Sequence, residues 1–319
     1  MSRPVILIAR RLPDAVLARA EKSYDIIVNY DDLPYSSEQI VEMSAKVDGI
    51  VACHSEQFTA AVVNALNPRV KIVANYSVGT DHCDLAAFAA RGIAVTNTPD
   101  VLSDATAEIT LLLLLGAARR AVEGDQMVRG GEWKFWSPSF MVGKQITGRR
   151  LGIIGMGRVG RAVARNARGL NMEIHYYNRN RLSSDVEAGA IFHETIESLL
   201  PISDFLSLHC PATTETKGLM TAERFALLPK GAIFVNAARG SLVDEAALIG
   251  AIESGGVSAA GLDCFVSEPG GNPAFSKYKN IFMLPHIGSS TEVTRDAMGF
   301  RALDNLDAFF AGVPPRDLK

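Results

Sequence analysis

The stretch LGIIGMGRVG, residues 151–160, decides the fold of this chain. Its first four residues are mostly apolar and predict a strand, which runs directly into the glycine-rich pattern GxGxxG. The following RAVARNARGL predicts a helix, and residues 173–177 predict the next strand. Strand, turn, helix and strand therefore occur in order within about thirty residues, which is the context that a dinucleotide-binding turn requires.

Each glycine of this turn has a physical role. Gly155 permits a tight turn, Gly157 lets the backbone approach a pyrophosphate, and Gly160 lets the helix pack closely on the strand. The start of the helix adds N–H groups and the positive end of the helix dipole, both of which favour phosphate. We expect a dinucleotide site here, and the alternative is a glycine-rich turn without a ligand.

The residues after the second strand indicate which dinucleotide binds. NAD-binding proteins usually place Asp or Glu there, about 20 residues past the glycines, to bind the ribose 2′-hydroxyl. Here residues 177–181 read YNRNR, without a carboxylate, and a guanidinium can bind a 2′-phosphate through two hydrogen bonds. We predict a preference for NADP(H) over NAD(H), with Arg179 as the main contact and Asn178 and Arg181 in support. The alternative is a solvated basic turn.

Short apolar runs rich in β-branched residues alternate with helical patterns along the chain. The predicted strands are residues 4–8, 24–28, 49–52, 72–75, 94–96, 151–155, 173–177, 205–208, 232–235, 259–263 and 281–284. The predicted helices are residues 14–21, 37–43, 59–66, 103–119, 158–168, 194–200, 221–228, 244–254 and a last amphipathic one over 292–311. This alternation predicts an α/β protein with parallel sheets and helices on their faces.

Composition narrows the class of protein. The 319 residues are 48% hydrophobic and 21% charged with a net charge of −3, which gives no global attraction to nucleic acid or to an anionic membrane. The longest uncharged apolar run, residues 109–118, is about half of the ~20 residues needed to span a bilayer. The N-terminus lacks the apolar run of a secretory signal, and the four cysteines and six histidines show no metal-ligand spacing. We expect a cytoplasmic protein with reduced thiols and no metal.

A polar stretch with exposed aromatic residues spans 124–148 and contains GGEWKFWSPSF. Its glycines and Pro138 argue against regular structure. We interpret it as a surface loop or as a segment that packs on a partner subunit.

Three later segments place polar residues just past predicted strands, where ligands bind in open α/β sheets. They contain Arg239, Glu268 and His286, respectively. Together these residues offer a cation for a carboxylate, a carboxylate partner and an acid or base.

At these segments the chain resembles the D-isomer-specific 2-hydroxyacid dehydrogenases. The motifs that carry the resemblance are NYSVGTD (75–81), RGIAVTNTPD (91–100), DATAE (104–108), GMGRVG (155–160), LHCPATTETKGLM (208–220), NAARGSLVDEAAL (236–248), GLDCFVSEP (261–269) and LPHIGSST (284–291). The Asn-Arg pair at 178–179 most resembles the NADPH-dependent glyoxylate/hydroxypyruvate reductase branch.

The resemblance implies roles for single residues. His286 would protonate the carbonyl oxygen as hydride arrives from the nicotinamide, with Glu268 hydrogen-bonded to its imidazole and Arg239 bound to the substrate's carboxylate and carbonyl. Backbone N–H groups of Val78 and Gly79 would hold the substrate carboxylate. The implied cofactor contacts are Arg158 and Val159 at the pyrophosphate, Cys210, Pro211 and Thr216 on the adenosine side, Thr106, Ala237 and Asp263 on the nicotinamide side, and Gly288.

The resemblance also implies two doubly wound domains. Residues 1–98 and 288–319 would form a flavodoxin-like substrate-binding domain, and residues 99–287 an inserted Rossmann NAD(P)-binding domain. A hinge near Pro99 and Gly288 would close the cleft. Members of this family are typically homodimers joined through the nucleotide domain, which fits the apolar 103–119 helix and the aromatic stretch after it.

We expect an NADPH-dependent reductase of small 2-oxo acids, glyoxylate and hydroxypyruvate foremost. A second possibility is a reductase of 2-ketogluconate or another bulkier 2-oxo acid, which Trp136, Phe140 and Met141 could cap. A third is a non-catalytic NADP-sensing module, against which the presence of Arg239, Glu268 and His286 argues.

Overall fold

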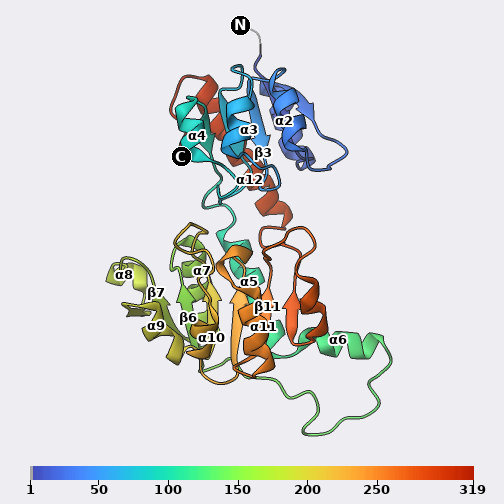
Figure 1. The fold of residues 1–319 in the computed structure, drawn as a ribbon, viewed down its shortest axis with the longest axis vertical. Helices are drawn as coiled ribbons and strands as arrows, with labels where there is room; N and C mark the ends of the chain where they lie inside the picture. The colour runs from blue at the N-terminus through green and yellow to red at the C-terminus, as the bar shows by residue number, and fades with distance from the viewer. Residues whose placement is uncertain (1–2) are drawn as a thin grey trace. The chain divides into compact units, whose positions relative to one another are not determined.

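The computed structural model describes residues 3–319, which form two compact α/β units (Figure 1). The first unit comprises the chain up to Leu102 together with Ser290–Lys319, and the second comprises Ser103–Ser289. Each unit has one sheet in which every strand pair is parallel, which confirms the predicted fold class. The assignment of substrate to one unit and nucleotide to the other stays a prediction.

The first unit has a five-stranded sheet in the order β2-β1-β3-β4-β5, the order of flavodoxin-like folds. Its strands are β1 (Val5–Ile8), β2 (Asp25–Val28), β3 (Gly49–Ala52), β4 (Ile72–Asn75) and β5 (Ala94–Thr96). Its helices are α1 (Asp14–Ser23), α2 (Ser37–Ser44), α3 (Ala60–Ala65), α4 (Leu85–Ala90) and α12 (Glu292–Phe310).

Helices cover both faces of this sheet, because two separate apolar clusters flank it. One cluster combines strand residues such as Val73 with side chains of α2, α3 and α4, including Phe88. The other combines strand residues such as Ile72 with side chains of α1 and α12. The last helix of the chain is therefore a full member of the first unit's core.

The second unit has a seven-stranded sheet in the order β12-β11-β10-β9-β6-β7-β8. Its strands are β6 (Arg150–Ile154), β7 (Glu173–Tyr177), β8 (Ile191–His193), β9 (Phe205–Leu208), β10 (Ala232–Asn236), β11 (Val257–Leu262) and β12 (Ile281–Met283). Its helices are α5 (Ser103–Ala118), α6 (Ala121–Arg129), α7 (Arg158–Gly169), α8 (Ser184–Glu187), α9 (Ile196–Leu199), α10 (Ala222–Ala226) and α11 (Glu245–Glu253), with short 3₁₀ turns at η1 (Leu200–Ile202), η2 (Gly240–Leu242) and η3 (Pro273–Lys277). The strand order reverses between β6 and β9, where dinucleotides bind in Rossmann folds.

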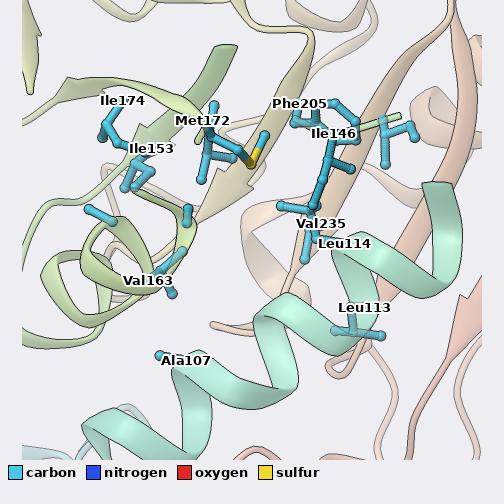
Figure 2. Close-up of a cluster of buried hydrophobic side chains, with 14 of the residues drawn as sticks. Ala107, Leu113, Leu114, Ile146, Ile153, Val163, Met172, Ile174, Phe205 and Val235 are labelled. Carbon is cyan, nitrogen blue, oxygen red and sulfur yellow. The ribbon is translucent and has the colours of Figure 1, made fainter. Parts of the chain in front are cut away.

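The core of the second unit also lies on both faces of its sheet. Figure 2 shows one cluster, in which Leu113 and Leu114 of α5 and Val163 of α7 gather with strand residues such as Ile153. A second cluster joins the sheet to α9, α10 and α11. This packing fixes the carboxyl ends of the strands, from which the candidate site residues project.

The sequence-based description was wrong at the start of the 124–148 stretch. Helix α6 runs through Gly124 to Arg129, where an ion pair between Asp125 and Arg129 at 2.8 Å links successive turns. A single glycine in a helix costs only about 1 kcal/mol, so it does not end the helix here. From residue 130 to 149 the chain has no helix or strand, as predicted.

Besides α6, three short elements were not predicted: the helices α4 and α8 and the strand β8. Helix α4 is LAAFAA, too short for a helical period to show, and β8 is a three-residue strand at the edge of its sheet. Among residues 3–319, no helix is both long enough and apolar enough to cross a membrane.

Candidate active site

Arg239 follows β10 in a turn that its neighbours hold in place. The side chain of Asn236, at the end of β10, donates to the carbonyl oxygen of Arg239 at 2.8 Å and accepts from the N–H of Ala238 at 3.0 Å. Gly240 then packs against the next loop so closely that a Cβ there would lie 1.9 Å from the carbonyl carbon of Phe265. This contact brings the Arg239 turn against the loop that carries Glu268.

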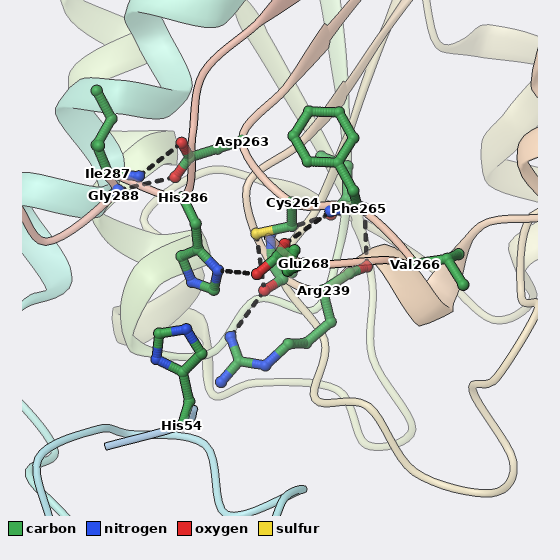
Figure 3. Close-up of polar contacts among 12 residues, drawn as sticks. His54, Arg239, Asp263, Cys264, Phe265, Val266, Glu268, His286, Ile287 and Gly288 are labelled. Atoms are coloured by element: carbon green, nitrogen blue, oxygen red, sulfur yellow. Dashed lines mark hydrogen bonds and ion pairs between the residues drawn. The ribbon is translucent and has the colours of Figure 1, made fainter. Parts of the chain in front are cut away.

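Glu268 and His286 form a hydrogen-bonded pair (Figure 3). The Oε2 atom of Glu268 lies 2.6 Å from Nδ1 of His286, and its Oε1 accepts from the N–H of Phe265 at 2.7 Å. Both side chains are partly exposed, at 24% and 27%, so solvent or a ligand can reach them. The carboxylate thus fixes the imidazole through one nitrogen and directs the other nitrogen, Nε2, away from itself.

Asp263, at the end of β11, holds the turn on which His286 lies. Its two carboxylate oxygens accept the N–H groups of Ile287 and Gly288 at 2.8 and 2.7 Å. Burial raises the pKa of this carboxyl, while these two N–H groups act in the opposite direction. A Cβ on Gly288 would lie 3.4 Å from the Thr106 side chain, so Thr106, Asp263 and Gly288 meet at one point.

The glycine-rich turn after β6 has the geometry of a phosphate cradle. Gly155 adopts a φ of +98°, and a Cβ there would lie 2.4 Å from the backbone nitrogen of Cys210. A Cβ on Gly160 would lie 2.2 Å from the Gly155 carbonyl oxygen, whereas one on Gly157 would meet nothing within 4 Å. Gly157 begins α7 without a side-chain cap, so the first N–H groups of a twelve-residue helix face this open space. A pyrophosphate fits that arrangement.

The loop after β7 contains the three residues predicted to meet a 2′-phosphate, and they differ in their contacts. The amide oxygen of Asn178 accepts from the N–H of Met156 at 2.7 Å, which ties the loop to the glycine-rich turn. Arg179 is exposed and lies in electrostatic range of Glu215. Arg181 instead binds Glu187 through two hydrogen bonds, at 2.8 and 3.1 Å. The structure therefore gives Arg179 and Arg181 different environments.

The segment after β9 lies beside the glycine-rich turn, at the point where the strand order reverses. The hydroxyl of Thr216 donates to the carbonyl oxygen of Pro211 at 2.7 Å, which closes a compact turn. Burial raises the pKa of the neighbouring Cys210 thiol to about 11, so it stays protonated at neutral pH. Burial also lowers the pKa of His209 to about 3, and this imidazole contacts the Ser207 hydroxyl at 2.8 Å. His209 is thus a neutral structural group of the turn.

Val78 and Gly79 follow β4 in the first unit, and hydrogen bonds set the direction of their peptide planes. The carbonyl oxygen of Ser77 accepts from the N–H of Thr98 at 2.9 Å, and that of Val78 accepts from the side chain of Asn97 at 2.8 Å. In a trans peptide the N–H points opposite to the C=O. The N–H groups of Val78 and Gly79 therefore point away from the 97–98 segment, as two donors side by side.

Sequence reasoning missed the residues that hold these groups in position. They are Ser77, Asn97, Glu187, Asn236 and Glu245, the last of which accepts from the N–H of Val266 at 2.9 Å. Each is an ordinary polar residue in a loop or at an element end, and only the spatial position of its partner reveals its role. The remaining predicted contacts, Arg158, Val159 and Ala237, lie at the start of α7 and just after β10.

Comparison with known proteins places this geometry in a family. Residues 111–288 match the model of the D-isomer specific 2-hydroxyacid dehydrogenase, NAD binding domain. The chain is 42% identical over 314 residues to a glycerate dehydrogenase of Hyphomicrobium methylovorum, covering 98% of both chains. It is also 42% identical over 319 residues to a glyoxylate reductase of Thermococcus kodakarensis, covering 98% of this chain and 95% of that one.

A solved structure agrees with these matches. The NADPH-dependent glyoxylate/hydroxypyruvate reductase of Sinorhizobium meliloti, in complex with NADP and malonate, superposes with a TM-score of 0.88 at 32% identity, covering 100% of this chain and 97% of that one. Fold, glycine-rich turn and relatives together define a dinucleotide-binding oxidoreductase of the 2-hydroxyacid dehydrogenase type. The chain belongs to the D-isomer-specific 2-hydroxyacid dehydrogenase family.

Proposed function

We propose that this protein is an NADPH-dependent reductase that converts small 2-oxo acids, glyoxylate and hydroxypyruvate, to 2-hydroxy acids. The observation that carries the proposal is the 2.6 Å contact between Glu268 and His286 in the unit that also holds Arg239 and the glycine-rich turn. The similarity to a glyoxylate reductase and to a glycerate dehydrogenase supports the substrate class.

The chain's own groups can perform the acid–base part of such a reduction. Because Glu268 engages Nδ1 of His286, Nε2 is the nitrogen that would give its proton to the substrate's carbonyl oxygen. The contact with Glu268 holds the imidazole in one orientation, which this proton transfer requires. Arg239 would bind the carboxylate and polarise the carbonyl. The N–H groups of Val78 and Gly79 remain proposed donors to a substrate carboxylate.

NADPH, when bound, would supply the hydride. We assign its pyrophosphate to the N–H groups at the start of α7 and its 2′-phosphate to Arg179. No carboxylate stands at residues 177–181, so nothing in that segment repels a phosphate dianion. The further predicted contacts are Thr106, Cys210, Pro211, Thr216, Ala237, Asp263 and Gly288.

The first experiment compares initial rates with glyoxylate and hydroxypyruvate, each with NADPH and with NADH. We expect rapid turnover with NADPH and poor use of NADH, and Arg179→Ala should remove most of that difference. Good turnover with NADH would contradict the cofactor assignment and leave the substrate class standing. If neither acid is reduced, larger 2-oxo acids such as 2-ketogluconate are the next substrates to test.

His286→Ala separates an enzyme from a protein that only senses NADP. The enzyme should lose turnover in this variant and keep its affinity for NADPH, because the imidazole is assigned to the substrate. A wild-type protein that binds NADPH and reduces no 2-oxo acid would instead be a sensor.

We further propose a homodimer joined through the second unit. Three aromatic side chains of the segment after α6 are mostly exposed: Trp133 at 55%, Phe135 at 64% and Trp136 at 74%. Exposed apolar side chains also lie on α5, at Leu112 and Leu115, and a second copy of the chain would remove them from water. Sedimentation velocity should give twice the monomer mass, and a monomer would contradict the assignment.

Since none of the four cysteines within residues 3–319 forms a disulfide, we also propose a cytoplasmic location.

A further inference from the structure

Glu187 is buried in an otherwise exposed part of the second unit. It ends the short helix α8, whose other three residues are exposed or half-exposed, yet only 7% of the Glu187 side chain is accessible. A carboxylate is rarely buried unless it is paired and hydrogen-bonded. Its partners therefore identify what it holds.

Those partners all belong to the strand and loop that carry Arg179. The hydroxyl of Tyr176, a fully buried residue of β7, donates to Oε1 of Glu187 at 2.5 Å. Arg181 donates to both carboxylate oxygens, from Nε at 2.8 Å and from Nη2 at 3.1 Å. The N–H of Leu182 donates to the Tyr176 hydroxyl at 3.1 Å, which fixes the loop's far end to the same group.

Two more contacts secure this network. The guanidinium of Arg181 lies 5.8 Å from the centre of the Phe192 ring on β8, within cation–π range. The side chain of Arg168 on α7 donates to the carbonyl oxygen of Glu187 at 2.9 Å. The loop between Tyr177 and Leu182 is thus fastened at its start through Asn178 and at its end through Glu187.

We infer that Glu187 is a positioning residue for cofactor specificity. It binds Arg181 in place and so fixes the backbone of residues 178–182, with Arg179 as the one arginine of that segment directed to the 2′-phosphate. This inference rests on the proposed NADPH preference. The supporting role that the sequence predicted for Arg181 is thereby made indirect, through the backbone of the loop.

The test measures the dissociation constants of NADPH and NADH by fluorescence titration for the wild type, Arg179→Ala and four further variants. Glu187→Gln removes the charge that holds Arg181, and Arg181→Ala removes its partner, which is 64% exposed and so tolerates truncation. We expect each variant to weaken NADPH binding about five- to tenfold. NADH binding should change less than about twofold, because NADH lacks the phosphate whose contact is mispositioned.

The double variant should bind NADPH no more weakly than either single variant, because both remove the same interaction. Asp185→Asn is the matched control: it removes the same charge from the same helix, at an exposed position outside the network. It should change neither affinity by more than about twofold.

Several outcomes would overturn the inference. If Glu187→Gln binds NADPH as well as the wild type or more tightly, Arg181 is not held for this purpose. If NADH and NADPH affinities fall together, Glu187 supports only the fold. If Arg179→Ala abolishes the preference while Glu187→Gln and Arg181→Ala do not alter it, the proposed function stands and this inference fails. A wild type that binds NADH more tightly than NADPH contradicts both.

Discussion

At the scale of single residues, the carboxylate of Glu268 holds both a backbone N–H and the imidazole of the proposed proton donor. Glu268 accepts from the N–H of Phe265 with one oxygen and contacts His286 with the other, so the loop that carries it and the imidazole are fixed together. Nearby, Glu245 holds the same loop by accepting from the N–H of Val266 and from the side chain of Asn272. Variants of these two glutamates can therefore distinguish support of the loop from support of the imidazole.

Glu268→Gln should lower kcat for glyoxylate reduction about 100-fold, with little change in NADPH affinity. The amide keeps the size of the side chain but replaces the charge-assisted hydrogen bond to the imidazole with a weaker neutral one. Steady-state rates and NADPH titration measure the two effects separately. Glu245→Gln is the control, and we expect its kcat to fall less than about threefold. Equal losses in both variants would show that Glu268 acts only by holding the loop.

At the scale of secondary structure, the ends of elements were harder to predict than their interiors. Strands β3, β4 and β5 have the predicted bounds, because their residues are mostly apolar or β-branched and polar turns follow them. Helix α6 was not predicted, because its stability depends on charge pairs of an exposed helix, including Arg120 with Glu123 at 2.7 Å.

The residues of the candidate site also differ in how readily a local sequence pattern reveals them. Arg239, Glu268 and His286 could be found because each follows a recognisable strand, and parallel strands bring their carboxyl ends to one edge. The different contacts of Arg179 and Arg181 could not be found, because they depend on Glu187, which is adjacent in space through the fold of α8. Sequence patterns point to candidate chemical groups more readily than to the residues that hold them in position.

Asn97 is a positioning residue of the turn after β4, and its role can be tested by substitution. It is buried, and its side chain holds the Val78 carbonyl that orients the Gly79 N–H. Asn97→Ala should raise KM for glyoxylate about tenfold with a smaller effect on kcat, because the Gly79 N–H, which we propose binds substrate, loses its orientation. Thr98→Val is the matched control, since the buried Thr98 hydroxyl has no hydrogen-bond partner among the described residues. A KM for Asn97→Ala within twofold of wild type would count against the assigned role of these N–H groups.

At the scale of the whole molecule, the first unit is built from both ends of the chain. Helix α12 and the residues after it complete a core that begins with β1, and Lys319 donates its N–H to the Val95 carbonyl at 2.9 Å. Asp317 links this C-terminal segment to the rest of the unit. Its side chain binds Arg301 and Asn305 of α12, and its own carbonyl accepts from the N–H of Asn97. The second unit forms from a continuous segment and has no such dependence on the C-terminus.

Asp317→Asn should therefore destabilise the first unit by about 2–3 kcal/mol at pH 7, because the side chains of Arg301 and Asp317 are only 14% and 5% exposed. Burial by itself raises the pKa of Asp317, but hydrogen bonds from Arg301 and Asn305 outweigh it and hold the pKa below its ordinary value. The resulting stability is present above the unfolded-state pKa, near 4, and is lost as pH falls through the lower folded-state value.

Urea unfolding at pH 7 and pH 3, followed by probes in each unit, should show that the variant and wild type differ less in acid than at neutral pH. Asp304→Asn removes an exposed carboxylate of the same helix, paired with Arg19 at 2.7 Å, and should cost less than about 1 kcal/mol. If the two variants are equally stable at pH 7, the attachment of the C-terminal segment does not depend on the buried pair.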